Sequence, residues 1–172
     1  MKFFQKNGSL FFDYLRKSGF PEIINWENDL KISEYIKNSV IERVILRDIS
    51  FIFKLAMILL ERIVKLILST PGSIININSL SRDWGASKIT ISNYLKFLEI
   101  SLLVRSLSNF RPAFLSASRK LKKFYPTTPS LIFSHSKEVF EKNLGAVLET
   151  YVVNTLNANY YFRRGKKEIN II

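Results

Sequence analysis

The stretch SLSRDWGASKITISNYLKFLEISLLV, residues 79–104, decides the fold that this sequence predicts. Leu80 and Trp84 stand four residues apart, which places them on one face of a short helix. Gly85 is expected to end that helix, because glycine readily adopts the left-handed conformation found at helix C-termini. Ser87 is a favourable N-cap for a second helix. The stretch therefore predicts two helices joined by a tight turn.

The second helix of this pair has an apolar stripe and a polar outer face. Ile91, Leu95 and Leu98 follow the helical spacing that points side chains toward a core. The outer positions carry short polar or cationic groups, which can reach phosphates and base edges. Ile89, near the helix start, could contact a thymine methyl group or another protein. The residues of this helix expected to contact DNA are Ser87, Lys88, Thr90, Asn93 and Lys96.

A strand and a basic return follow the second helix. Residues 101–110, SLLVRSLSNF, alternate as a β-strand does, and residues 119–133, RKLKKFYPTTPSLIF, can supply the returning strand. A helix pair followed by two strands and a basic loop is typical of a winged helix. If the returning segment is extended, Lys120 and Lys122 face outward while Leu121 turns toward the core. The wing residues expected to hold phosphates are Arg111, Arg119, Lys120, Lys122 and Lys123.

The positive charge is concentrated in the second part of the chain. Residues 1–61 have a net charge of +1 and residues 62–172 a net charge of +11, and no acidic residue lies between Ile100 and Lys137. A polyanion, and double-stranded DNA in particular, is the expected partner. The alternative is that the complementary acidic surface lies on a partner domain. Aromatic candidates for stacking on bases, among residues otherwise expected in the core, are Phe110, Phe114, Phe124 and Tyr125.

The N-terminal part of the sequence predicts helices. An aromatic helical pattern stops at Gly19, a second amphipathic helix is expected after Leu30, and a long apolar helix covers residues 51–68. The segment STPGS, residues 69–73, ends that helix. A short extended piece then leads into the helix pair, for which Asn78 is the expected N-cap.

Composition excludes several classes of protein. The longest apolar run is interrupted by Lys54, Glu61, Arg62 and Lys65, which would be costly in a lipid-facing span, so no membrane partner is expected. The absence of cysteine excludes disulfides, zinc fingers and thiol catalysis and favours the cytoplasm. His135 is the single histidine, so a histidine-based metal cluster cannot form. We expect no metal and no cofactor.

Taken in order, these segments resemble the C-terminal portion of a family of predicted archaeal and bacterial AAA-type ATPases. YLRKSGFPEII (residues 14–24) and VIERVILRDI (residues 40–49) resemble the helical lid of that family, and residues 77–104 resemble its winged helix. Three further segments resemble the opening of a restriction-endonuclease-like last domain: KKFYPTTPSLIFS (residues 122–134), LGAVLETYVVNTL (residues 144–156) and YYFRRGKKEINII (residues 160–172).

The resemblance implies catalytic parts that the sequence lacks. No G-x-x-x-x-G-K-[ST] phosphate loop occurs, so ATP binding is not expected. Asn170 replaces the acid of a strand motif that in the family more usually reads Glu-Ile-Asp, and an amide holds Mg²⁺ less strongly than a carboxylate. The simpler interpretation has Glu149 on a surface helix and a β-hairpin that turns at Gly165. No residue is expected to be catalytic, and the vestigial nuclease-like residues are Glu149, Glu168 and Asn170.

The expected fold class is mainly α (α+β). Residues 1–68 should form a helical lid-like region, residues 69–133 a winged-helix domain, and residues 134–172 a small truncated α/β appendage of the nuclease-like type. The expected function is that of a non-catalytic DNA-binding module derived from an AAA-type ATPase. The alternative is a protein-interaction or regulatory module that docks an ATPase domain or an acidic partner, and a homodimer is left open.

Overall fold

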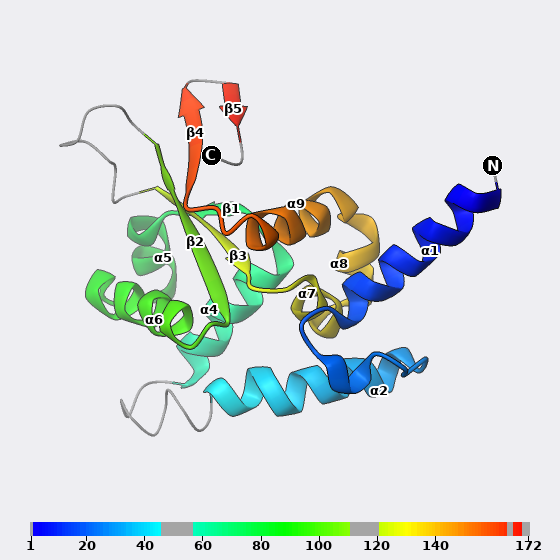
Figure 1. Ribbon diagram of the computed structural model, residues 1–172. Helices are drawn as coiled ribbons and strands as arrows, with labels where there is room; N and C mark the ends of the chain where they lie inside the picture. The colour runs from blue at the N-terminus through cyan, green and yellow to red at the C-terminus, as the bar shows by residue number, and fades with distance from the viewer. Residues whose placement is uncertain (1, 46–56, 111–120, 165–166, 170–172) are drawn as a thin grey trace.

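The computed structural model describes residues 2–45, 57–110, 121–164 and 167–169. Helices predominate in these ranges, and five strands form one small sheet (Figure 1). The predicted mainly α (α+β) class is therefore confirmed. Within the same ranges, no helix has the length and apolar character needed to cross a membrane.

The N-terminal part is helical, as predicted. Helix α1 (Lys2–Lys17) ends before Gly19, whose φ of 87° lies in the left-handed region that glycine adopts at little cost. The 3₁₀ helix η1 (Pro21–Ile23) follows. Helix α2 (Asp29–Ile36) begins where the Asn28 side chain accepts a backbone hydrogen bond of 3.1 Å. A polar N-cap thus sets the start of α2.

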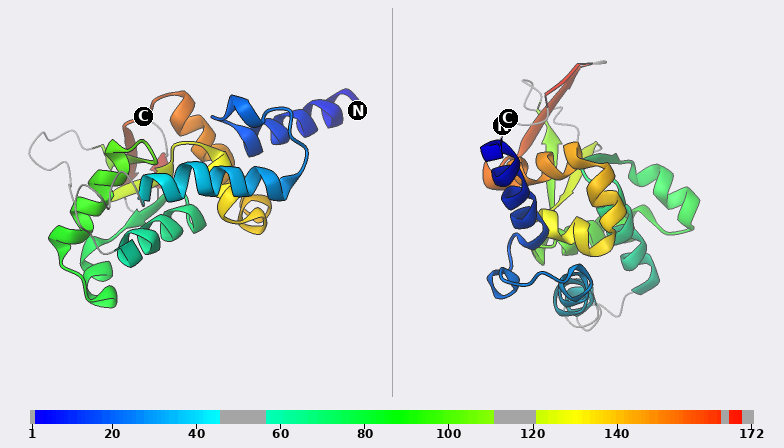
Figure 2. Two further views of the ribbon diagram at one scale, coloured as in Figure 1. Left: turned by 90° about the horizontal axis from the view of Figure 1, so that it is seen from below. Right: turned by 90° about the vertical axis from the view of Figure 1, so that its right-hand side faces the viewer.

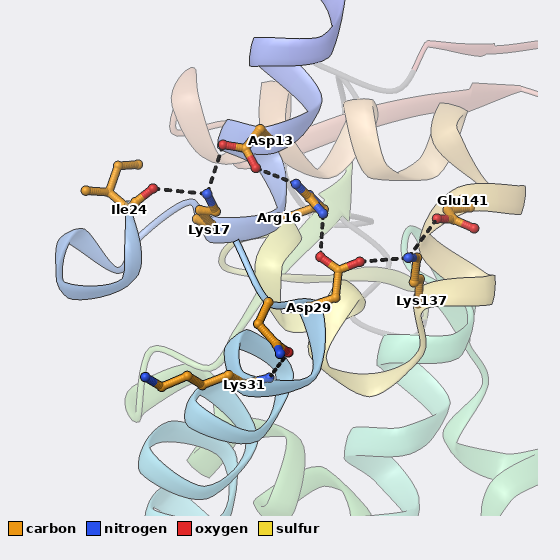
Figure 3. A network of polar contacts seen from close by, with 9 residues as sticks. Asp13, Arg16, Lys17, Ile24, Asp29, Lys31, Lys137 and Glu141 are labelled. Carbon is orange, nitrogen blue, oxygen red and sulfur yellow. Dashed lines mark hydrogen bonds and ion pairs between the residues drawn. The ribbon is translucent and has the colours of Figure 1, made fainter. Parts of the chain in front are cut away.

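A network of ion pairs joins α1 to α2 and to α8 (Lys137–Lys142), as Figure 3 shows. Arg16 pairs with Asp13 on its own helix and with Asp29 at the start of α2. The other oxygen of Asp29 lies 2.7 Å from Nζ of Lys137. Because Asp29 receives cations from two other helices, it holds all three helices together.

The middle of the chain combines helices with three short strands. The elements there are the π-helical continuation of α2, η2 (Lys37–Glu42), and then α4 (Met57–Ser69), β1 (Ser73–Ile75), α5 (Ile77–Trp84), α6 (Lys88–Ile100), β2 (Val104–Asn109) and β3 (Lys122–Pro126).

The turn between α5 and α6 follows its local sequence. Gly85 has a φ of 63° and closes α5, and Ser87 Oγ accepts the N–H of Thr90 (3.0 Å) and caps α6, as predicted for both. The predicted cap of α5 was wrong, because Asn76 and not Asn78 accepts the first backbone N–H groups of that helix. The side chain of Ile77 packs against the core, which brings the helix start forward by two residues.

The sheet has the strand order β1-β3-β2-β4-β5. Strand β3 is antiparallel to both of its neighbours, β1 and β2. Strand β4 (Tyr160–Arg164) runs parallel to the end of β2, and β5 (Lys167–Ile169) pairs antiparallel with β4. The antiparallel pairing of the predicted C-terminal hairpin is confirmed, whereas its expected turn residue Gly165 lies outside the described residues. The attachment of this hairpin to β2 is a feature that the sequence did not predict.

Helices cover both faces of this sheet (Figures 1 and 2). The large apolar core includes residues of α4, α6 and α7 (Pro129–His135) together with Phe124 of β3. A smaller cluster joins Leu107 and Tyr125 of the sheet to Val153 of α9 (Leu144–Thr155). The large core also contains Leu15 of α1 and Val147 of α9. Residues from all three predicted parts of the chain therefore pack in one core. That division stays a prediction.

Candidate nucleic-acid interface

Helix α6 presents polar and cationic side chains on its outer face and packs against the core through its inner face. Ile91, Leu95 and Leu98 are buried, which confirms the predicted core stripe. The Ser87 cap bonds both the N–H and the hydroxyl of Thr90 (3.0 and 2.8 Å), so these two residues order the first turn. Among the predicted contact residues of this helix, Thr90 is half-buried and the exposed ones are Ser87, Lys88, Asn93 and Lys96.

The same outer face also carries apolar side chains. Ile89 is 74% exposed in the first turn of α6, and Ile100 is 67% exposed at its last residue. Two isolated aliphatic residues are compatible with contact to thymine methyl groups or with a protein surface. The outer face of α6 is therefore mixed, with exposed isoleucines as well as cations.

Part of the predicted phosphate-binding wing lies outside the described residues, namely Arg111, Arg119 and Lys120. Of the others, Lys122 is half-buried, and its Nζ donates to Ser106 Oγ (3.1 Å) and lies 3.7 Å from a carboxylate oxygen of Glu99. A phosphate at Lys122 would therefore compete with a carboxylate that the protein itself supplies.

Lys123 requires a correction, because its side chain is buried in the fold. Its Nζ pairs with Glu168 on β5 and lies 3.7 Å from Glu149 on α9. The ring of Tyr161 lies beneath the ammonium group, at 5.4 Å. Strand alternation turns Lys123 toward α9, where two carboxylates neutralise it. The prediction that Lys123 binds phosphate is therefore wrong.

The buried lysine belongs to a compact polar cluster. Tyr125 donates its hydroxyl proton to Glu149 at 2.6 Å. Burial raises the pKa of Tyr125 well above its usual value, and the hydrogen bond and negative charge of Glu149 raise it further. Glu149 lies on the partly exposed helix α9 and turns its carboxylate toward the sheet. These groups stabilise the packing of α9 and β5 on the sheet.

The nuclease-like residues are only partly brought together. Glu149 and Glu168 both contact Lys123, whereas Asn170 lies outside the described residues. Among the residues that the structure describes, no group of three or more histidine, aspartate or glutamate side chains could hold a metal ion. What the described part shows is a lysine with two carboxylate partners, which has the geometry of a structural ion-pair cluster.

His135 lines a cavity between η2, α4 and the end of α7. The cavity has a volume of about 530 Å³, and the Nε2 atom of His135 lies 2.9 Å from Ser69 Oγ. Burial lowers the pKa of His135, and the charges of Lys65 and Lys37 lower it further. The remaining lining residues are Ile41, Glu42, Ile45, Glu61, Val64, Leu68 and Ser134.

The aromatic candidates separate into two groups. Phe124 and Tyr125 are buried in the core, whereas Phe110 is 42% exposed, and Phe114 lies outside the described residues. Phe110 forms an aromatic pair with Tyr160 of β4, a residue that the sequence interpretation missed because it lies fifty positions away. The segments around Phe110 and Tyr160 are both rich in Lys and Arg, and this shared composition was the signal in the sequence that could have associated them.

These features define a mainly α protein whose polar helix pair packs on a small mixed sheet. The chain belongs to the family described as a domain of unknown function (DUF8612), whose model matches residues 8–138. The matched region contains the helix pair and the strands β1, β2 and β3, and it ends before α9 and the β4–β5 hairpin. No curated protein matches the chain, and no solved structure matches it.

Proposed function

We propose that this chain is a winged-helix module that binds double-stranded DNA, with α6 as the recognition helix. The observation that carries the proposal is the outer face of α6, where Lys88, Asn93 and Lys96 are exposed on a capped helix. The order of elements β1-α5-α6-β2-β3, in a sheet ordered β1-β3-β2, supports it as the arrangement expected of a winged helix.

In this proposal the side chains of α6 divide the tasks of recognition. Asn93 has the donor and acceptor pair that suits an adenine edge in the major groove. Lys88 and Lys96 neutralise phosphates on the flanking backbone, and the positive end of the helix dipole lies beside Lys88. The wing cations Arg111, Arg119 and Lys120 add phosphate contacts, and Lys122 contributes only when phosphate displaces Glu99.

A salt titration of binding to duplex DNA tests this proposal. The double variant Lys88→Ala/Lys96→Ala should weaken binding to all sequences and lower the magnitude of the slope of log K against log salt by about two. The matched control is Lys37→Ala/Lys142→Ala, which removes the same charge from exposed positions outside α6. Equal slopes for the wild type and the α6 variant, or no binding at low salt, would refute the proposal.

A second candidate is docking of another protein, either an ATPase domain or an acidic partner. The exposed Ile89 favours this candidate, since an isolated aliphatic side chain is an effective anchor in a protein interface. The substitution Ile89→Lys separates the two functions. It should preserve or strengthen binding to duplex DNA, whereas it should abolish a docking contact centred on the isoleucine.

The broader assignment is also a proposal. We propose that the chain carries out no catalysis, derives from AAA-type ATPases and works in the cytoplasm. Support comes from the sequence, which has no phosphate loop and no cysteine. A melting experiment with and without Mg²⁺-ATP tests the first point, because nucleotide binding to the folded state would raise the melting temperature.

A further inference from the structure

Two exposed aromatic rings meet where β2 ends and β4 begins. The ring centroids of Phe110 and Tyr160 lie 6.0 Å apart, and the ring planes are tilted by 79°. The two residues are 42% and 46% exposed. Two nearly perpendicular rings form a corner, in which a flat molecule can stack on one ring and contact the other.

The backbone next to both rings is hydrogen-bonded within the sheet. Ser108 N–H donates to the carbonyl of Asn159 (3.0 Å), and Phe110 N–H donates to the carbonyl of Tyr161 (2.6 Å). The buried side chain of Asn109 accepts the N–H of Arg163 (3.1 Å). Since three hydrogen bonds hold the two segments in register, the aromatic corner is preorganised and loses little entropy when a ligand binds.

The corner lies on the sheet face that also holds α6. Ser108 is in register with Lys122 on one neighbouring strand and with Tyr160 on the other, so these three side chains form one row. Lys122 contacts Glu99 of α6, which identifies the face. The opposite face carries Leu107 and packs against α9. The aromatic corner is thus on the same side of the sheet as the proposed recognition helix.

The polar character of this surface indicates what the corner can bind. The other members of the row are Ser108 and Lys122, and Phe162 with its partner, the exposed Ile169, continues the same face along the hairpin. Residues 104–126 and 160–169 together contain ten Lys and Arg residues and a single acid, Glu168, and their formal charge of +9 is most of the +12 of the chain. Rings carried by strongly basic segments suit a ligand that is both flat and polyanionic.

We propose that Phe110 and Tyr160 form a stacking site for an unpaired base, so that the chain prefers DNA in which a duplex adjoins a single strand. This inference rests on the proposed DNA binding and adds its ligand class. An unpaired base is required because bases within a duplex offer only their edges to a protein, whereas stacking needs an open face. The hairpin formed by β4 and β5 extends beyond the end of β2 (Figure 1).

Binding to three matched DNA probes tests the inference. The probes are a blunt duplex, the same duplex with a single-stranded overhang, and that duplex with an abasic overhang, which keeps the phosphates and removes the bases. The wild type should bind the base-containing overhang about tenfold more tightly than either other probe, as expected from one stacked base. Equal binding of the base-containing and abasic overhangs would overturn the inference.

Protein variants provide the matching arm of the experiment. Phe110→Ala/Tyr160→Ala should lose the preference for the overhang and keep the affinity for the blunt duplex, and Phe110→Tyr/Tyr160→Phe should retain both. The control Phe11→Ala/Tyr14→Ala removes two similarly exposed rings from α1 and should change neither. If the alanine variant keeps the preference, the stacking site is refuted.

Failure of the inference and failure of the proposed function give different results. If the wild type binds all three probes equally and the Lys88→Ala/Lys96→Ala variant binds them all more weakly, DNA binding stands and stacking falls. If no probe is bound at low salt, both proposals fall. Binding of the overhang without any binding of the blunt duplex would refute the duplex-binding function and retain the stacking site.

Discussion

Gly72 is the residue at which the fold tolerates a side chain least. Its φ is 77°, and a Cβ atom placed there would lie 2.8 Å from the ring of the buried Tyr125. Its N–H donates to the carbonyl of Phe124 (2.8 Å), which holds the backbone close to β3. The close approach of α4 to the sheet therefore depends on glycine at this position.

We expect Gly72→Ala to lower the free energy of unfolding by about 2–3 kcal/mol, because strain at positive φ adds to a clash with a buried ring. Gly85→Ala should cost only about 1–2 kcal/mol, since Gly85 has a φ of 63° and open space around it. Gly145→Ala, within α9 and without close neighbours, should be neutral or stabilising. Urea unfolding of the three variants measures this order, and a smaller loss for Gly72 than for Gly85 would contradict it.

At the scale of elements, Lys123 connects β3 to both α9 and β5. Its two carboxylate partners, Glu149 and Glu168, come from segments that have no other ion pair to β3 among the described residues. A cation in this position offsets two partly buried negative charges at once. Lys123 is thus expected to stabilise the packing of the last helix and the last strand on the sheet, together with the Tyr125–Glu149 hydrogen bond.

We expect Lys123→Met to lower the free energy of unfolding by about 2 kcal/mol at neutral pH, because Glu149 loses its ion-pair partner and, among the described residues, Glu168 keeps only its 3.7 Å pair with the exposed Arg163. Lys122→Met, which removes a more exposed pair with Glu99, should cost less than about 1 kcal/mol. Chemical unfolding measures both values. The salt slope of DNA binding should be unchanged in Lys123→Met, and a reduced slope would mean that this lysine does reach phosphate.

At the scale of the whole molecule, ion pairs join α1 to α2 and α2 to α8, and Asp13 takes part in this network through Arg16, which pairs with both Asp13 and Asp29. Burial raises the pKa of Asp13, but hydrogen bonds and charge from Lys17 and Arg16 outweigh it, so the net effect is a pKa below its usual value of 3.8. A lowered carboxyl pKa contributes stability that is present above pH 3.8 and is lost as the pH falls through the folded-state value.

We expect the wild type to lose stability faster than Asp13→Asn as the pH falls below about 4, because the variant has no carboxylate to protonate. The difference between the two proteins in free energy of unfolding lost on acidification should stay below about 1 kcal/mol, since Asp13 is partly exposed and solvent screens its charge. Urea unfolding at a series of pH values measures it. Parallel curves for the two proteins would show that Asp13 contributes nothing to the acid sensitivity.

The sequence predicted the local elements well. Gly85, Ser87 and the stripe Ile91-Leu95-Leu98 act through neighbours within a few residues, so the turn and α6 were placed correctly. The start of α5 was misplaced, since two asparagines could cap it and packing of Ile77 chose between them. Local hydrogen bonding and periodicity are readable from sequence because their range is one or two helical turns.

By itself, the sequence determined the class of the fold, the order of its elements and the basic character of its second part. Only the tertiary structure decided the outcome for residues that meet across long separations. It buried Lys123 against Glu149 and Glu168, attached β4 to β2, and joined Phe110 to Tyr160 in an exposed pair. These contacts depend on which strands pair and in which register, and a pairing between distant segments leaves no periodic signal in either segment alone.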